Sequence, residues 1–588
     1  PYDRIYDENG KFVEKLSSGD WNPLYNAHLA KKNTRTYTSI QDNFNIDWRI
    51  IPALRLQGRI SYTRQFDKRD LFKSPESLDY STETDPKKKG TYFRSNSQSD
   101  KFDGNLTLQY NKVLGVHSLN VGVGSNLTES TEEGDSYTGV GFVNPNMIFI
   151  GAATSFKENS SPDGSYDKSR LVGFFGNVNY GYDNRYFLDL SFRTDGSSKF
   201  GRNSRFAPFW SVGVAWNVHK EAFWSGDEKS SLKLRASVGS TGTTNFSSTQ
   251  ALTTYNYDFS KIYNGVFGVS LAGYGNPELK WQNTISYNVG VDMTLLKGLV
   301  TFNGDFYIKN TENLLLPLTV APSTGFSSYV ENIGKLRNTG IEGRLRLNLI
   351  RDTQRDLRWN VTLSAFHNKS KITKLSNQLE EINKYANSDW YNQGTVVYRQ
   401  YEAGRSQTAL MMVRSGGIDP ATGNEVYIKR NGELTFEYDA NDKVKCGDMK
   451  PTIEGNVNTN LTWKGFTLYM LFKYQFGAKA YNGTLASKVE GANPYKNADK
   501  RVLYDRWKEP GDHAKFRRID DRTSPYQTTR LVFDNDLFSL SSVSLSYELP
   551  RSEDLCRSSS IDVEYDGRIS FVNHKARARD KLSFCPNF

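Results

Sequence analysis

Apolar and polar residues alternate along much of the chain, over stretches of about eight to eleven residues. In 285–295, apolar residues from Ile285 to Leu295 take every second position, and polar residues or glycine take the others. Period two places successive side chains on opposite faces of a β-strand. The pattern predicts about sixteen strands, each near the roughly ten residues that cross a bilayer at a tilt. Further examples begin at Leu54, Tyr186, Val300, Ile341 and Val457.

The connections between these strands alternate between short and long. Four are tight turns and at least five are long polar loops, which suits a barrel with short turns on one side and long loops on the other. We therefore expect an all-β protein: a transmembrane, antiparallel, up-and-down β-barrel with short periplasmic turns and long extracellular loops. The turns lie at 50–53, 183–184, 297–298 and 464–465, and the loops at 67–98, 131–167, 241–278, 373–454 and 477–535.

Composition agrees with strands. Aromatic residues make up 13% of the chain, and the mean hydropathy is −0.63. No run of about 18 apolar residues occurs, which excludes a membrane-spanning helix. Tyr182, Tyr186, Trp216 and Trp463 lie near strand ends and suit an interfacial aromatic girdle, although ordinary sheet aromatics remain the alternative for any one of them.

Charge and cysteine content narrow the classes of function. The net charge is +10, but Lys and Arg are spread along the chain, so we expect no nucleic-acid partner. The run Lys87 to Lys89 fits a solvated loop. Three cysteines give no disulfide framework, and no export leader precedes Pro1, which is expected of a cleaved or partial chain.

Candidate sites for chemistry are weak. The six histidines are far apart and form no HExxH pair, and there is no P-loop or nucleophile elbow, so we expect neither an enzyme nor a metal site. Asp439, Asn441 and Asp442 could hold calcium, but their spacing fits a solvated loop better. Aromatic residues of the long 373–454 loop could stack on sugar rings, with loop packing as the alternative. They are Trp390, Tyr391, Tyr398 and Tyr401.

Several motifs, in order along the chain, resemble the SusC/RagA family of Bacteroidota outer-membrane transporters. The resemblance spans residues 1 to about 550, and we read the motifs as turn and strand-end chemistry that contacts no ligand. They are RTDGSSKFG at 193–201 with RFAPFWS at 205–211, ENIG at 331–334 with NTGIE at 338–342, GIDPATG at 417–423, WKGF at 463–466, YQFG at 474–477, DRW at 505–507 with PGD at 510–512, and the stretch 537–550.

The resemblance implies a TonB-dependent importer of oligosaccharides or peptides. Such proteins have a barrel of roughly 22 strands closed by a plug. They use no cofactor, since the TonB–ExbB–ExbD system supplies energy from the proton motive force. A SusD-like surface lipoprotein pairs with them as a lid. We expect residues 1–550 to be the barrel domain in outer-membrane lipid, without the plug, the TonB-contacting segment and the first strands.

Residues 551–588 are charge-rich and hold Cys556 and Cys585. We expect them to be a frameshifted replacement of the last strands. With permitted codons for 571–588, reading one nucleotide later gives SSIIKRERGINYPFART, which resembles the lead-in to the closing strand of the family.

Three classes of function stay open on the sequence. Glycan import leads, with peptide import as its near relative. A passive porin or a surface adhesin built on a barrel is the second class, and a soluble glycan-binding β protein is the third.

Overall fold

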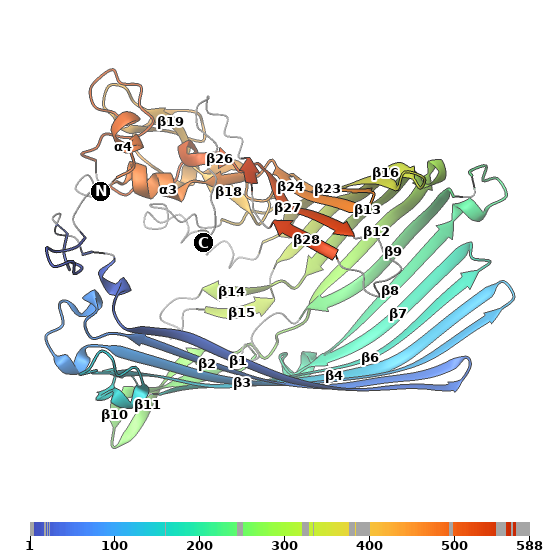
Figure 1. Cartoon of the computed structure of the whole chain (residues 1–588), viewed down its shortest axis with the longest axis horizontal. Helices are drawn as coiled ribbons and strands as arrows, with labels where there is room; N and C mark the ends of the chain where they lie inside the picture. The colour runs from blue at the N-terminus through green and yellow to red at the C-terminus, as the bar shows by residue number, and fades with distance from the viewer. Residues whose placement is uncertain are drawn as a thin grey trace, which may run out of the picture.

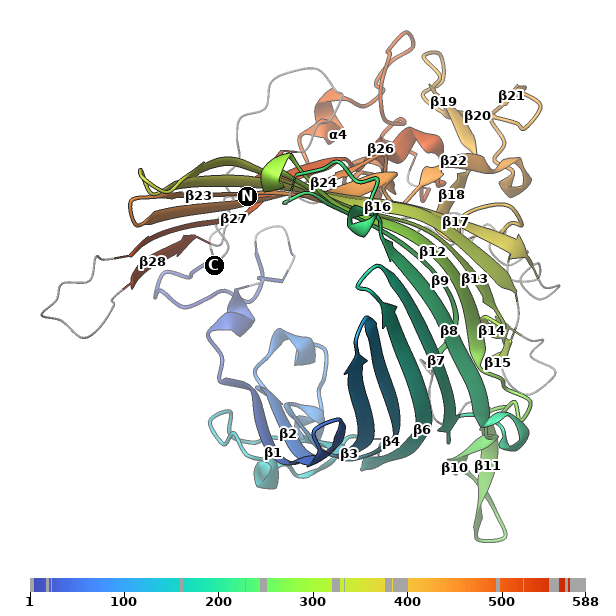
Figure 2. The ribbon, with the colours of Figure 1, turned by 90° about the vertical axis from the view of Figure 1, so that its right-hand side faces the viewer.

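The architecture comes from a computed structural model, and it describes residues 5–16, 19, 21–22, 24–158, 160, 162–227, 229–243, 251–319, 328–332, 334–375, 383, 400–492, 498–521, 523–548, 560–565 and 569–571. Fifteen long strands pair antiparallel, each with the next long strand along the chain. They lie in one 18-stranded sheet, which confirms the predicted up-and-down order. The sheet curls but stays open between its two edges (Figure 2). The strands are β1 (Lys31–Ile51), β2 (Leu54–Lys73), β3 (Thr91–Leu114), β4 (His117–Val140), β6 (Asp163–Tyr182), β7 (Tyr186–Ser197), β8 (Phe206–Asn217), β9 (Ser231–Thr243), β12 (Gln282–Leu295), β13 (Val300–Glu312), β16 (Lys335–Asp352), β17 (Leu357–Lys374), β23 (Ile453–Trp463), β24 (Phe466–Phe476) and β27 (Leu537–Glu548).

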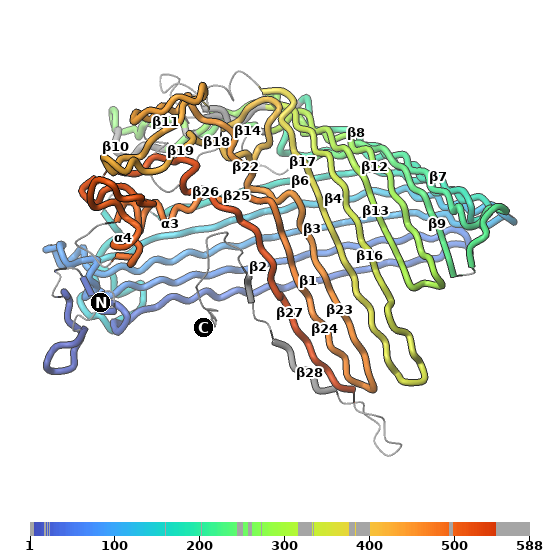
Figure 3. The backbone as a smooth tube through the Cα atoms, turned by 90° about the horizontal axis from the view of Figure 1, so that it is seen from above, coloured from blue at the N-terminus to red at the C-terminus, as the bar shows by residue number. Residues whose placement is uncertain are grey.

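The four predicted tight turns are present. Asp183, Asn184, Lys297 and Lys464 have positive φ, between 47° and 57°, and so produce sharp reversals between neighbouring strands. Tight turns gather at one end of the sheet and long connections at the other (Figures 1 and 3). No helix of the described residues is long and apolar enough to cross a membrane.

The first strands are longer than the sequence predicted. Strands β1, β2, β3, β4 and β6 have 20 to 24 residues. The predicted loops 67–98 and 131–167 are accordingly shortened to the segments between β2 and β3 and between β4 and β6. In these extensions polar residues occur on both faces and the regular alternation fades, but the ladder continues, and Phe72 and Tyr92 at its end are buried with Phe142.

The two faces of the sheet differ sharply, and we call them the apolar face and the polar face. Exposed apolar side chains such as Leu188, Leu190 and Phe192 share the apolar face, while Arg193 lies on the polar face. On β2 the apolar stretch runs from Leu54 to Tyr62. Those roughly nine residues, at about 3.4 Å rise and a 40° tilt, span about 23 Å, near the roughly 25 Å apolar band of membrane barrels.

Ion pairs mark the end of this band on the apolar face. Arg64 Nε lies 2.6 Å from Asp100 Oδ1, directly across β2 and β3, and Arg170 Nε lies 2.5 Å from Glu129 Oε2 across β4 and β6. At the opposite limit, by the tight turns, the predicted girdle residues gather. Tyr182 pairs with Tyr186, and Tyr186 pairs with Trp216.

The sheet continues past residue 550. Strands β28 (Ser560–Tyr565) and β29 (Ile569–Phe571) both pair antiparallel with β27. The boundary drawn at 550 therefore does not mark the end of strand pairing. The frameshift origin of 551–588 stays a prediction.

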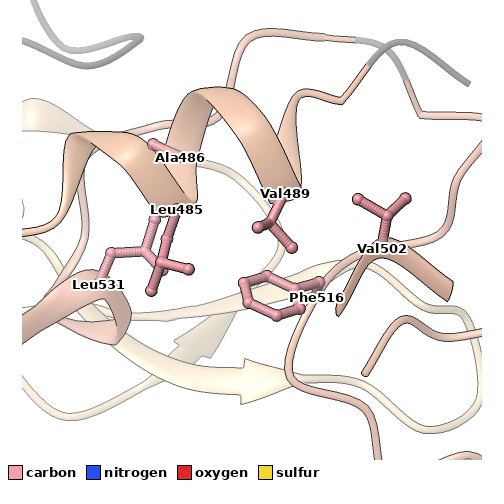
Figure 4. Close-up of a cluster of buried hydrophobic side chains, with 6 residues drawn as sticks. All are labelled: Leu485, Ala486, Val489, Val502, Phe516 and Leu531. Atoms are coloured by element: carbon pink, nitrogen blue, oxygen red, sulfur yellow. The ribbon is translucent and has the colours of Figure 1, made fainter. Parts of the chain in front are cut away.

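Two long connections fold into a compact unit, which we call the loop cap (described residues 400–452, 477–492, 498–521 and 523–534). It contains short strands β18–β22, β25 and β26 and helices α3 and α4 beside the sheet (Figure 1). Its core joins Leu485, Val489, Val502, Phe516 and Leu531 (Figure 4). Sequence reasoning treated both connections as polar loops. The strands and helices are β18 (Ala409–Met412), β19 (Arg414–Ile418), β20 (Glu425–Ile428), β21 (Leu434–Thr435), β22 (Val444–Asp448), β25 (Lys479–Tyr481), β26 (Val532–Asp534), α3 (Gly483–Leu485) and α4 (Arg501–Tyr504).

Candidate functional site

The polar face holds a cavity of about 710 Å³, which we call the wall cavity. Side chains from β1, β2, β3, β4 and β7 line it, including Arg59, Lys101, Asp103, Asn126 and Arg193. Its volume lies within the roughly 300 to 1,000 Å³ of typical small-molecule sites. Long strands fix these side chains at set spacings, since every second residue of a strand points to the same face.

Arg193 reaches the wall cavity from β7 by crossing β6. Its Nη2 donates to Asn126 Oδ1 on β4 at 2.7 Å, and its Nε donates to Asp195 Oδ1 at 2.6 Å. Gly173 on β6 makes this crossing possible: a Cβ there would lie 2.4 Å from Arg193 Nη2 and 2.5 Å from Asn126 Oδ1. The glycine thus leaves the space in which the guanidinium lies.

Two further cations face the wall cavity. Lys101 Nζ pairs with Asp103 Oδ2 at 2.8 Å. Arg59 Nη2 donates to the neutral Asn43 Oδ1 at 2.8 Å, and within the described part of the chain no carboxylate pairs with Arg59. An arginine has five donors, so Arg59 keeps donors for a ligand.

A second crossing of the same kind lies further round the polar face. Arg235 on β9 contacts Asp292 on β12 at 2.8 Å and Asp305 on β13 at 3.1 Å, and Gly290 on β12 leaves room for its guanidinium. Asp305 also lines a smaller cavity of about 400 Å³ with Glu342 and other residues. The polar face therefore carries cross-strand networks on both arcs of the sheet.

Two of the motifs found in the sequence meet in the loop cap. The ring of Trp507, from DRW, packs on the backbone at Gly423, at the end of GIDPATG. Its Nε1 donates to Pro420 O at 2.9 Å, and Gly511 N donates to the same carbonyl at 2.8 Å. These motifs are structural, as the sequence indicated, and their role is to join two loops.

The RTDGSSKFG motif is structural in a similar way, except for Arg193. Phe200 stacks on Trp281 with ring centroids 4.5 Å apart, and Phe209 meets the same indole edge-on. The Trp281 Nε1 donates to Arg205 O at 3.0 Å. This buried cluster fixes the connection after β7. Arg193, from the same motif, lines the wall cavity.

A buried ion network ties the loop cap together. Glu490 Oε1 accepts from Arg517 Nε at 2.8 Å, and Glu490 Oε2 lies 3.0 Å from Arg530 Nη1. Arg530 also pairs with Glu425 at 3.0 Å, so the network spans both segments of the cap. Burial alone would raise the pKa of Glu490, but Arg530 and Arg517 hold it below its ordinary value.

The predicted loop aromatics are only partly visible. Trp390, Tyr391 and Tyr398 lie outside the described residues. Tyr401 is half-buried, and its backbone N–H donates to Asn383 Oδ1 at 2.8 Å. A role of these four residues in sugar binding stays a prediction.

The possible calcium ligands have local partners. Asp439 Oδ1 accepts from Asn441 N at 2.8 Å, and Asp442 Oδ1 accepts from Arg430 N at 2.9 Å. The described residues contain no group of three or more His, Cys, Asp or Glu side chains that could hold a metal ion. The three residues shape a turn of the loop cap.

Sequence reasoning missed the wall cavity because its members come from five strands. The available signal was a glycine at a polar-face position, Gly173, beside a strand that carries an arginine. Such a pair becomes informative only when the register of β6 and β7 is known.

An apolar belt of membrane height, a polar concave face and turns at one end define the wall of a transmembrane β-barrel. The sequence model of a family described as "TonB dependent receptor-like, beta-barrel" matches residues 1–476. The chain belongs to this family of outer-membrane receptors and is of the SusC/RagA type.

Relatives and solved structures agree with this assignment. TonB-dependent receptor P3 of Formosa agariphila is 26% identical over 570 residues, covering 93% of this chain and 55% of that receptor. TonB-dependent receptor SusC of Bacteroides thetaiotaomicron is 24% identical over 579 residues, covering 90% of this chain and 54% of that receptor. The chain thus spans about half the length of these relatives.

The fold is similar to that of the RagAB peptide transporter. The TM-score is 0.81 at 21% identity, and the match covers 97% of this chain and 63% of that chain. At this identity the match shows the fold alone.

Proposed function

We propose that the protein imports oligosaccharides across the outer membrane in a TonB-dependent way. The observation that supports this proposal most directly is the cavity on the polar face, which is lined by amide, hydroxyl and charged side chains of β1, β2, β3, β4 and β7. Such groups exchange hydrogen bonds with the hydroxyls of a sugar chain. Residues 1–550 supply the barrel wall in this proposal.

The proposed partners follow from the family. A SusD-like lipoprotein would pair with the loop end of the barrel, where the loop cap lies (Figure 1). TonB–ExbB–ExbD would supply the energy from the proton motive force. No resident cofactor is part of the proposal.

Peptide import is the second candidate. The similarity in fold to the RagAB peptide transporter supports it. Peptides and sugars both present hydrogen-bonding groups, so the polar face suits either. Membership of a TonB-dependent receptor family speaks against a passive porin, a surface adhesin and a soluble glycan-binding protein.

The test is a clean deletion of the full-length gene, with any neighbouring lipoprotein gene intact. The deletion strain is grown on single purified glycans and on peptide mixtures, with the complemented strain as control. Loss of growth on a glycan supports the leading proposal. Loss on peptides alone moves the protein to peptide import, and normal growth on every source contradicts a nutritional role.

A further inference from the structure

The lining of the wall cavity has an unusual composition. Among its thirteen described residues, Gly104 is the only one without a polar side chain. The lining offers amides, hydroxyls and charged groups, and it contains no aliphatic or aromatic residue among those described. An apolar amino-acid side chain would therefore gain little by entering it.

The charges of the cavity are unequal. Arg59, Lys101 and Arg193 face it together with a single carboxylate, Asp103. Lys101 pairs with Asp103, and Arg193 pairs with Asp195. Arg59 has no carboxylate at ion-pair distance among the described residues: it donates to the neutral amide of Asn43, and its charge acts on Asp103 only at longer range.

The geometry around Arg59 suits an anionic group. A guanidinium presents donors in a planar fork that matches a carboxylate or a sulfate. Arg193 is held in place nearby by Asp195 and Asn126, through the space at Gly173. A rigid second cation lowers the entropy cost of binding, since it is already oriented.

We propose that the wall cavity is a binding site for an acidic oligosaccharide, a sugar chain that carries carboxylate or sulfate groups. The inference rests on the proposed function, because it names the substrate class of the importer. Arg59 binds the anionic group, and the surrounding amides and hydroxyls bind the ring hydroxyls.

The test measures binding to the purified full-length receptor in detergent by isothermal titration calorimetry. The probes are trigalacturonate, its fully methyl-esterified form and a sulfated galactan trisaccharide. The ester keeps the sugar chain but removes its charge. We expect the ester to bind at least about tenfold more weakly than the acid, since hydrogen bonds to charged groups are the stronger ones.

Matched variants locate the effect. Arg59→Gln is expected to weaken binding of the acidic probe about tenfold or more, and Arg59→Lys to restore part of it. The control is Arg69→Gln, because Arg69 lies on the same face of β2 but outside the cavity. It removes the same charge and is expected to change binding less than about threefold.

Three results would overturn the proposal. Equal binding of acid and ester would remove the role of charge. Equal losses of affinity in Arg59→Gln and Arg69→Gln would show that the positive charge of the whole face attracts the probe and that no local site binds it. Tighter binding of triglutamate than of either acidic sugar would change the ligand class to an acidic peptide. Binding of the sulfated probe in place of trigalacturonate supports the site and assigns sulfate as the group.

The failure of this inference can be told from the failure of the proposed function. A deletion strain that loses growth only on neutral glycans keeps the importer and contradicts the acidic site. Growth unaffected on all sources, with charge-dependent binding to the purified receptor, keeps the site and contradicts the nutritional role.

Discussion

The sheet and the loop cap are held together by different physics. Nearly every residue of β1 is exposed, whichever face of the sheet its side chain lies on. The main contact of β1 with the rest of the protein is its pairing with β2. In the loop cap, Met412, Val489 and Glu490 are 0% to 1% exposed, and apolar packing surrounds a charged network. The stability of the sheet depends on its surroundings, which are lipid on one face and water on the other. The stability of the cap depends on the packing and ion pairs of its own interior.

The largest expected effect is in the loop cap. Glu490→Gln leaves Arg517 and Arg530 without their shared carboxylate, which should destabilise the cap by roughly 3 to 5 kcal/mol. Hydrogen exchange of residues 477–534 in the detergent-purified receptor measures this loss.

Glu433→Gln is the matched control, since Glu433 pairs with Lys429 at an exposed site. Its effect should stay below about 1 kcal/mol. Similar exchange rates in the two variants would show that the buried network does not stabilise the cap.

The sheet should respond to position relative to the lipid. Leu190→Arg places a charge within the apolar band and should cost about 2 to 4 kcal/mol. Thr36→Arg lies on the same face but beyond the band, so its cost should be within about 0.5 kcal/mol. Urea unfolding in lipid vesicles compares the two, and equal costs would refute the assigned band.

The loop cap should also gain stability as the pH rises from 8 toward 9.5. Burial lowers the pKa of Lys443 to about 8. Between that value and the ordinary Lys value near 10.4, the unfolded cap binds more protons than the folded cap, so its stability rises with pH, by up to roughly 3 kcal/mol in all.

Limited proteolysis of the cap at pH 7.5 and 9.5 measures this gain. In Lys443→Met the pH dependence should flatten. Burial also raises the pKa of Cys446 in β22, so this thiol opposes part of the gain near pH 9, and burial raises the pKa of Tyr427 and Tyr481, which opposes the gain above pH 10.

The smallest effect on stability is expected on the polar face. At Gly173 a new Cβ would meet only the ends of flexible side chains, so Gly173→Ala should change unfolding by less than about 1 kcal/mol. The variant should still weaken binding of the acidic probe, because Arg193 must leave its place. A large loss of stability with normal binding would contradict the proposed role of the glycine.

The membrane part of the fold could be predicted from the sequence because lipid imposes alternation. The alternation is clear from Ile285 to Leu295, and it ends at the turn that contains Lys297. Beyond the band that constraint is absent. Residues such as Ser95 and Asn96 still pair with β2, although nothing in their pattern shows a strand.

The loop cap and the wall cavity could not be predicted in this way. Leu485 packs with Phe516 and Leu531, which are distant in sequence and carry no period. Arg193 and Asn126 meet only through the pairing of three strands. Of the predicted sugar-binding aromatics only Tyr401 lies in the described part of the chain, and its role stays a prediction.

The loop cap is assembled from segments on both sides of the hairpin formed by β23 and β24. Val413 forms a bridge to Thr528, so the two segments of the cap meet across that hairpin, and pairing of β23 and β24 with β17 and β27 brings these segments close together. During biogenesis the cap should therefore form late. Closing long loops before the sheet exists costs conformational entropy that no strand pairing yet offsets. The presence of a folded cap would then indicate that this part of the barrel has already assembled.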